Sequence, residues 1–318
     1  MRVVIYGVGA VGASLAFFAR WFQANEVHLV GRKEVVEPME REGILYAPHS
    51  GGPPTLAKGF RAWWGPHALE KLARSCGAPD VVAFCVKAYD LETAAREASP
   101  ALTKYRPWVL LAMNGLGLAE LVKPFAPGCR IVEVSVQHPA ALEGNLVRNT
   151  GANDHFSLPA DAAVREMVSR CFDPAHLKFV ENFEEVKWLK VAANSAVNAV
   201  TALAAARVGH ALANPSLRAL VVEAVLEVER VARAAGVAFS VDPVEWLLEF
   251  AGRDPRHVTS TLQDLLKGKR TEAEFFNGAV SRAGGRLGVP TPVNEALSVL
   301  VRVVERAALG RGFDYSLK

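Results

Sequence analysis

Short apolar runs alternate with helical segments in the first part of the chain. Residues 2–6 form a β-branched run that leads into a glycine-rich turn and then an apolar helix pattern to about residue 24. Strands that alternate with helices are typical of parallel βαβ units. Further buried strands are expected at residues 26–30, 80–86, 108–113, 130–136 and 177–180. The stretch after residue 136 reads as a loop up to residue 161, where a helix follows.

The pattern changes near residue 181. Beyond it Ala, Leu, Val, Arg and Glu recur at helical spacing almost to residue 309, and the breaks fall at Gly, Asn-Pro and Asp-Pro positions. We therefore expect two domains, an α/β domain over residues 1–181 and an all-α domain over residues 182–318.

The second domain is expected to open with a long apolar helix over residues 186–206. Residues four apart share a helix face, so Lys190, Asn194 and Asn198 should form a polar row about 12 Å long. Buried polar groups need hydrogen-bond partners. Either the two amides bridge to neighbouring helices while the lysine reaches water, or the row lines a pocket with Lys190 as an acid.

The turn after the first strand reads Gly7-Val8-Gly9-Ala10-Val11-Gly12. A G-x-G-x-x-G sequence is informative only between a strand and a helix, and both are expected here. Gly7 would permit the tight turn, Gly9 the close approach of a pyrophosphate, and Gly12 the packing of helix on strand. The helix dipole favours phosphate at this end. We therefore predict a Rossmann-type dinucleotide-binding domain.

Cationic residues follow the second strand, where an NAD site would usually place an acidic residue. Arg32 and Lys33 suit a ribose 2′-phosphate, which predicts NADPH as the cofactor, although a solvated turn is the other interpretation and Glu34 lies next to them. Lys87 and Asn114 come directly after later strands, where ligands bind in open α/β sheets.

Composition excludes several other classes of protein. The chain has 318 residues and a net charge of +3, with a single compact basic cluster at residues 267–270, which argues against a nucleic-acid surface. Four cysteines lie far apart, without the spacing of a zinc site or a disulfide framework. The N-terminal apolar run is too short for a signal peptide, and the longest apolar helix is too polar for a membrane span. We expect a cytoplasmic protein without a metal.

Taken in order, the motifs of this chain resemble those of the ketopantoate reductases (2-dehydropantoate 2-reductases), over nearly the whole length. The matching motifs are Gly7-x-Gly9-x-x-Gly12 with Arg32, Lys87-Ala88-Tyr89, Asn114-Gly115-x-Gly117, Trp188-x-Lys190-x3-Asn194-x3-Asn198, Ser260-x2-Gln263-Asp264, Thr271-Glu272, Asn277-Gly278 and Pro290-Thr291-Pro292.

The resemblance implies an NADPH-dependent reductase of coenzyme A biosynthesis, with its substrate between a Rossmann domain and a helical domain. In that family the residue matching Lys190 is the general acid, and the residue matching Glu272 holds the substrate hydroxyl. Residues matching Asn194, Asn198 and Ser260 orient the substrate. Those matching Arg32, Lys87 and Asn114 belong with the cofactor, and Asn114 is also expected near the substrate.

Two other functions stay open from the sequence. The chain could reduce a different small 2-oxo acid, with a histidine such as His138, His210 or His257 as the acid. It could also be a non-catalytic NADPH-binding sensor, because fold does not fix function. The long apolar helices of the second half suggest a homodimer.

Overall fold

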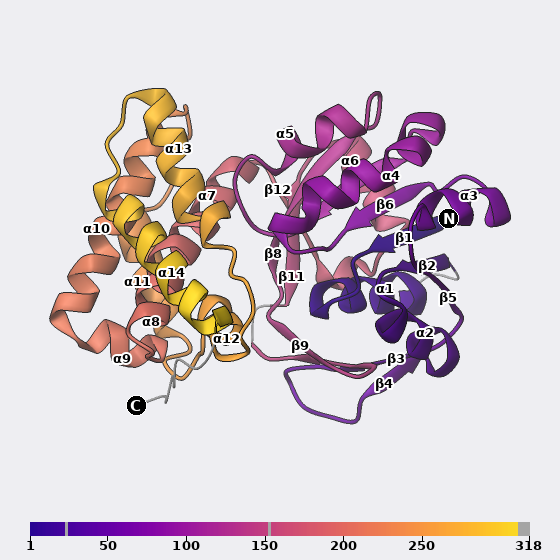
Figure 1. Cartoon of the computed structure of the whole chain (residues 1–318), viewed down its shortest axis with the longest axis horizontal. Helices are drawn as coiled ribbons and strands as arrows, with labels where there is room; N and C mark the ends of the chain where they lie inside the picture. Colours follow the sequence, from indigo (N-terminus) through magenta and orange to yellow (C-terminus); the bar gives the residue numbers. More distant parts are fainter. Residues whose placement is uncertain (23–24, 152–153, 311–318) are drawn as a thin grey trace. The chain divides into compact units, whose positions relative to one another are not determined.

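The computed structural model describes residues 1–22, 25–151 and 154–310. It divides into two compact units, Met1–Phe183 and Glu184–Lys318. Figure 1 colours the chain from the first unit in indigo and magenta to the second in orange and yellow. The expected helix end at residues 23 and 24 lies outside the described residues.

The first unit contains two sheets and the helices that pack on them. Its strands are β1 (Arg2–Tyr6), β2 (Glu26–Val30), β3 (Ile44–Ala47), β4 (Thr55–Ala57), β5 (Phe60–Trp63), β6 (Val81–Phe84), β7 (Trp108–Ala112), β8 (Ile131–Gln137), β9 (Ala140–Glu143), β10 (Leu146–Asn149), β11 (His155–Pro159) and β12 (Leu177–Val180). Its helices are α1 (Ala10–Phe22), α2 (Lys33–Glu42), α3 (Ala68–Cys76), α4 (Leu91–Tyr105), α5 (Leu118–Val122) and α6 (Ala162–Ser169).

The main sheet has eight strands in the order β12-β11-β8-β7-β6-β1-β2-β5. All its neighbours pair in parallel except β11 and β8, which are antiparallel. The order reverses at β1, which lies between β2 and β6. Ligands of open α/β sheets bind beyond the carboxyl ends of the strands at such a switch point, so the sheet places the turn after β1 where a dinucleotide would bind.

Both faces of the central strand β1 are covered. Val3 and Ile5 belong to a core cluster that also contains residues of α1 and α6, whereas Val4, which points to the opposite face, is equally inaccessible to solvent. A parallel sheet buried on both faces explains the nearly continuous apolar runs of its strands.

The expectation of a loop between residues 137 and 161 was wrong. Strands β9 and β10 form a second sheet with the earlier strands, in the order β4-β3-β10-β9, and β11 joins the main sheet beside β8. In Figure 1 this small sheet lies beside α1. Each of β9 and β10 has four residues, and their sequences, Ala-Ala-Leu-Glu and Leu-Val-Arg-Asn, do not alternate apolar with polar residues.

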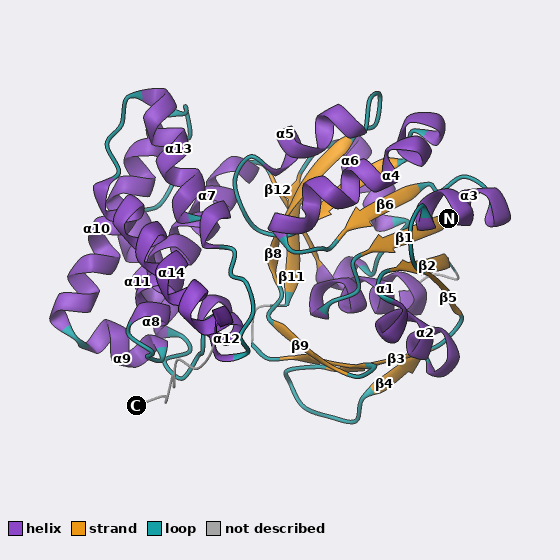
Figure 2. Cartoon of the chain, in the orientation of Figure 1, coloured by secondary structure: helices purple, strands orange, loops and turns teal. Residues whose placement is uncertain are grey.

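The second unit is helical throughout its described part, as Figure 2 shows by colour. Its α-helices are α7 (Phe183–Ala193), α8 (Ala199–Leu203), α9 (Val208–Ala213), α10 (Pro215–Ala234), α11 (Pro243–Gly252), α12 (Ser260–Leu266), α13 (Asn277–Leu287) and α14 (Pro292–Gly310). Asn214 and Asp242 cap the first turns of α10 and α11 with side-chain oxygens, as their Asn-Pro and Asp-Pro sequences indicate. The α/β plus all-α fold class is confirmed.

The expected continuous helix over residues 186–206 is interrupted. It starts at Phe183, becomes π-helical over Asn194–Asn198 and resumes as α8, which ends at Leu203. Ala205 then adopts a positive φ of 48°. We call Asn194–Asn198 the π segment; its residues are all buried.

Candidate active site

The glycine-rich turn has the geometry that a bound pyrophosphate needs. Gly7 has a φ of 95°, and a Cβ at this position would lie 2.5 Å from the Val86 side chain. A Cβ on Gly12 would lie 2.2 Å from the carbonyl oxygen of Gly7, so both positions require glycine. A Cβ on Gly9 would meet nothing within 4 Å. The turn is therefore open on the side where α1 begins, and its residues fit a dinucleotide phosphate.

Arg32 lies where the sequence placed it, after β2 and immediately before α2. Its side chain is 79% exposed, and Nη1 is 3.6 Å from the Glu34 carboxylate. Lys33 faces Glu37 at 3.7 Å and the Trp64 ring at 5.4 Å. Exposed pairs of this kind contribute little to stability, so both cations can reorient toward a phosphate.

Lys87 and Asn114 follow adjacent strands of the main sheet, β6 and β7. Lys87 directly precedes a 3₁₀ turn at Ala88–Asp90 and is partly buried. The Asn114 side chain accepts a hydrogen bond from the Val136 amide at 2.9 Å and donates one to the Val136 carbonyl at 3.1 Å. Asn114 therefore ties the end of β7 to β8, a role that the sequence did not reveal.

Lys190 is partly buried in the last turn of α7. Its ammonium lies 5.4 Å from the centre of the Phe250 ring, and no carboxylate of the described residues forms an ion pair with it. Desolvation lowers the pKa of Lys190 to about 8. A desolvated ammonium with no paired carboxylate among the described residues is destabilised, and an anionic or polar ligand beside it would lower its free energy.

The two asparagines of the row are buried in the π segment, each 8% exposed. Asn198 Nδ2 donates to Ser260 Oγ at 3.2 Å and lies 3.5 Å from Asn194 Oδ1. Ser260 is an exposed residue at the start of α12. The structure thus brings these three predicted residues together, and the Nδ2 group of Asn194 has no hydrogen-bond partner among the residues that are described.

The residue before Glu272 is fixed by hydrogen bonds to α14. Thr271 beside it donates from its backbone amide and its hydroxyl to Glu305 Oε2, at 2.7 and 2.6 Å. Glu272 itself is partly buried and precedes a short 3₁₀ helix at Ala273–Phe275. The next α-helix, α13, begins only at Asn277.

Sequence reasoning missed that Phe250 lies near Lys190, and it named His257 only as an alternative acid. Phe250 lies on α11, and His257 follows in the next loop. Burial lowers the pKa of His257, Asp254 opposes this effect, and the charge of Lys190 lowers it further. His257 is therefore neutral near pH 7, which does not favour it as the proton donor. Nothing in the local sequence marks Phe250, because an aromatic residue in a helix usually indicates core packing.

A separate cluster of polar side chains contacts α1, the helix that follows the glycine-rich turn. His138 Nε2 contacts Ser14 Oγ of α1 at 2.8 Å, and His138 Nδ1 contacts Asp154. Asp154 also lies within 3.3 Å of His176 Nδ1, and Tyr46 donates to it at 3.2 Å. The order Ser-His-Asp resembles a hydrolytic triad, but Ser14 is fully inaccessible to solvent. The cluster connects α1 to the segment after β8.

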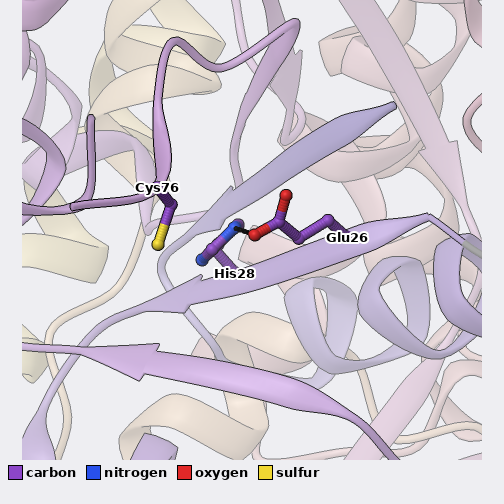
Figure 3. A group of neighbouring side chains, drawn as sticks. All are labelled: Glu26, His28 and Cys76. Carbon is purple, nitrogen blue, oxygen red and sulfur yellow. Dashed lines mark ion pairs between the residues drawn. The ribbon is translucent and has the colours of Figure 1, made fainter. Parts of the chain in front are cut away.

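Glu26, His28 and Cys76 offer possible metal ligands within 4.8 Å of one another (Figure 3). The environment favours hydrogen bonding instead. Trp63 Nε1 donates to His28 Nδ1 at 3.0 Å, so the ring proton of the neutral histidine lies on Nε2, facing Glu26 Oε1 at 3.2 Å. Burial lowers the pKa of His28 to about 4, and the Arg61 guanidinium contacts Cys76 Sγ at 3.3 Å.

Comparison with known proteins matches both units to family models. Residues 3–160 match "Ketopantoate reductase PanE/ApbA", and residues 182–305 match "Ketopantoate reductase PanE/ApbA C terminal". The chain is 35% identical to 2-dehydropantoate 2-reductase of Pyrobaculum aerophilum over 240 residues, 74% of this chain and 82% of that protein. It is 27% identical to that of Pyrococcus horikoshii over 98% of this chain and 99% of the relative.

Solved structures share the fold. A PanE/ApbA family ketopantoate reductase from Ralstonia eutropha superposes with a TM-score of 0.84 at 28% identity, over 97% of this chain and 99% of that one. D-mandelate dehydrogenase, solved with NADH and anilino(oxo)acetate, has a TM-score of 0.83 at 23% identity, over 97% and 99%. The dimeric ketopantoate reductase of Staphylococcus aureus has 0.74 at 21%, over 97% and 100%.

Among the described residues no helix combines the length and the apolar character that crossing a bilayer requires.

Three observations lead to one conclusion: the glycine turn at the switch point, the polar row on α7 and the π segment, and the matches along both units. The chain belongs to the ketopantoate reductase (PanE/ApbA) family.

Proposed function

We propose that this protein reduces 2-dehydropantoate to pantoate with NADPH; its relatives are named 2-dehydropantoate 2-reductase. The observation that carries the proposal is the ammonium of Lys190, which has a lowered pKa, no counterion among the described residues, and buried amides in the adjoining π segment. A desolvated cation can polarise a ketone and then give up a proton.

When bound, NADPH supplies the hydride that reaches the 2-oxo carbon. Lys190 Nζ donates its proton to the ketone oxygen, which becomes the hydroxyl of the product, and the neutral amine regains a proton from solvent. Asn194, Asn198 and Ser260 hold the substrate through hydrogen bonds, and Glu272 accepts one from its hydroxyl group.

The cofactor side of the proposal rests on the first unit. The amides at the start of α1 and the open side of Gly9 hold the pyrophosphate. Arg32, with Lys33, contacts the ribose 2′-phosphate and so distinguishes NADPH from NADH. Lys87 contributes a further cation near the switch point. Asn114, already bonded to β8, fixes the start of the loop between β7 and α5 on the cofactor side.

The direct test is the loss of NADPH absorbance with 2-dehydropantoate, beside pyruvate, 2-oxoisovalerate and a reaction without substrate. Turnover restricted to 2-dehydropantoate supports the proposal. Preference for another of these 2-oxo acids keeps the chemistry of Lys190 but assigns a different substrate. Tight NADPH binding without turnover on any of them would leave a sensor as the better interpretation.

A kinetic variant tests the acid separately. Lys190→Ala should lower kcat by roughly 100-fold or more, as expected when a general acid is removed, with a smaller change in KM for NADPH. A Lys190→Ala protein that keeps the wild-type kcat would show that another group donates the proton. Lys187→Ala, one turn earlier on α7 and paired with Glu184, is the matched control and should keep wild-type kinetics.

We also propose a homodimer that uses an apolar face of α14. Val299, Leu300 and Val303 are 50, 50 and 58% exposed and lie on one face of this helix by their spacing. Exposed apolar patches on a folded chain mark sites of association with another protein. The S. aureus relative is described as dimeric, which supports a second copy of the chain as the partner.

A further inference from the structure

The π segment changes the direction in which Asn198 points relative to Lys190. Along a regular α-helix, eight residues advance by about 800°, which leaves Asn198 roughly 80° away from the face of Lys190. A π-helical turn contains roughly one extra residue and so lags an α-helix by roughly 70–100°. The two effects nearly cancel, and Asn198 returns to the face of Lys190. The proposed site needs Lys190 and Asn198 on one face of the helix, and this arrangement therefore depends on the π segment.

One side chain from outside the helix is hydrogen-bonded to the π segment. Asn277, at the start of α13, donates from Nδ2 to the carbonyl oxygen of Ser195 at 2.8 Å. A side chain that inserts into the backbone ladder is a recognised cause of helix irregularity. Asn277 thus supplies a donor to a carbonyl within the segment where the regular hydrogen-bond register is lost.

Asn277 is itself held in a fixed orientation. Its Nδ2 group also donates to Asn294 Oδ1 at 3.0 Å, so both amide hydrogens are used. Asn294 Nδ2 donates to Glu227 Oε2 at 2.8 Å and to the Ala224 carbonyl at 3.1 Å. Asn277, Asn294 and Glu227 are at most 1% exposed. The amide cannot flip without leaving buried polar atoms unpaired.

The network is anchored at the far end by a helix start. The two Glu227 carboxylate oxygens accept hydrogen bonds from the backbone amides of Val293 and Asn294, both at 2.8 Å, in the first turn of α14. A carboxylate at a helix N-terminus is favoured by the exposed amides and the dipole. The π segment is therefore connected through α13 and α14 to the middle of α10.

We infer that Asn277 is a positioning residue: held by Asn294 and Glu227, it fixes the π segment and so keeps Asn198 on the face of Lys190. The structural part of the inference stands on the hydrogen bonds alone. Its consequence for substrate binding rests on the proposed function.

The test compares Asn277→Asp, which keeps the size but removes the Nδ2 donor, with Ser281→Ala as the matched control. Ser281 lies one turn later on α13 and donates only to the Asn277 carbonyl, so its removal costs one hydrogen bond without affecting the π segment. Both variants are studied as full-length protein by hydrogen–deuterium exchange of peptides covering residues 190–203, and by steady-state kinetics. Asn277→Ala replaces Asn277→Asp if the buried carboxylate prevents folding.

Loss of the Nδ2 donor should accelerate amide exchange across residues 194–199 by roughly tenfold or more, with no change in peptides of the first unit. KM for 2-dehydropantoate should rise by roughly tenfold while KM for NADPH stays unchanged. Ser281→Ala should match the wild type in both measurements.

Unchanged exchange in the Asn277 variant would overturn the inference, whatever the activity. Accelerated exchange with an unchanged KM for the 2-oxo acid would overturn the link between the π segment and the substrate. A wild-type protein without turnover would overturn the proposed function instead, and the exchange measurement would still decide the structural part.

Discussion

Lys190 carries its charge where water solvates it poorly. Burial lowers its pKa to about 8 from the 10.5 of an ordinary lysine, and the centre of the Phe250 ring lies 5.4 Å from its ammonium. A general acid works best when its pKa lies near the working pH. The same desolvation that makes this lysine costly to bury therefore suits it to give up a proton.

The pH dependence of kcat/KM should report this group, because kcat/KM follows the ionisation of the free enzyme. The folded-state pKa is lowered, so the protonated, proton-donating form disappears as pH rises through about 8 instead of above 10. We expect kcat/KM for ketone reduction to be nearly constant from pH 6 to 7 and to fall about tenfold per pH unit well above 8. Initial rates at substrate concentrations well below KM measure it.

A kcat/KM that stays constant to pH 10 would contradict the lowered pKa. Phe250→Leu is the matched probe of the surroundings. It removes the ring face that stabilises the ammonium, so the descending limb should move to lower pH without disappearing.

Cofactor preference should depend on one exposed guanidinium. Removing Arg32 should raise KM for NADPH by roughly tenfold, the effect of one lost charge-assisted phosphate contact, and leave KM for NADH nearly unchanged. Parallel titrations with both cofactors measure the ratio. Glu34→Ala is the control: it frees Arg32 from its 3.6 Å partner and should not weaken NADPH binding. Equal effects of Arg32→Ala on both cofactors would contradict the 2′-phosphate assignment.

At the scale of elements, the segment after β8 forms strands and contacts α1, which its sequence did not indicate. It forms β9 and β10 of the small sheet and carries His138 and Asp154 to α1. Hydrogen bonds and charges from His138 and His176 hold the pKa of the Asp154 carboxyl well below its usual range, against the opposing effect of burial. Asp154 in turn raises the pKa of His176.

Replacing Asp154 by asparagine should destabilise the first unit by about 1–3 kcal/mol, the cost of leaving buried hydrogen-bonding groups poorly paired. Urea unfolding at pH 7 measures this loss. A carboxyl with a lowered folded pKa contributes stability above its unfolded pKa, so the difference between wild type and variant should shrink as pH falls below about 4. Asp161→Asn, which retains a capping side chain at α6, is the control. A difference that does not depend on pH would contradict the assignment.

The sequence identified elements whose determinants are local. Strand β12 has the predicted bounds, and the capped starts of α10 and α11 follow from Asn214 and Asp242. The small sheet was missed because β10 pairs with β3, about a hundred residues earlier in the chain. The π segment was missed because its partner Asn277 lies 82 positions later. The candidate row was found for the opposite reason, since polar residues in an apolar helix are visible locally.

At the scale of the whole molecule, each unit has its own fold and its own candidate site residues. The described residues provide an open glycine-rich turn in the first unit and a desolvated lysine in the second. The second unit also presents an apolar face on α14, which has no partner within its described part.

The proposed dimer predicts a change in mass when this face becomes charged. Val299→Asp combined with Val303→Asp should shift the sedimentation mass from twice 34.2 kDa to 34.2 kDa, because two carboxylates from each copy would be buried in a symmetric contact. Val241→Asp, an exposed valine away from α14, should leave the mass unchanged. A wild-type chain that sediments as a monomer would contradict the dimer.

The π segment also separates the identity of the site residues from their phase. An α-helix of the same length would rotate Lys190 and Asn198 roughly 80° apart, although every functional side chain would remain in the chain. Deleting one residue from the segment, for example Ala196, would instead place them seven positions apart, about 700° along a regular α-helix, and so return them to one face. A deletion in this helix can therefore restore an alignment that the loss of the π segment removes, which no single substitution can do.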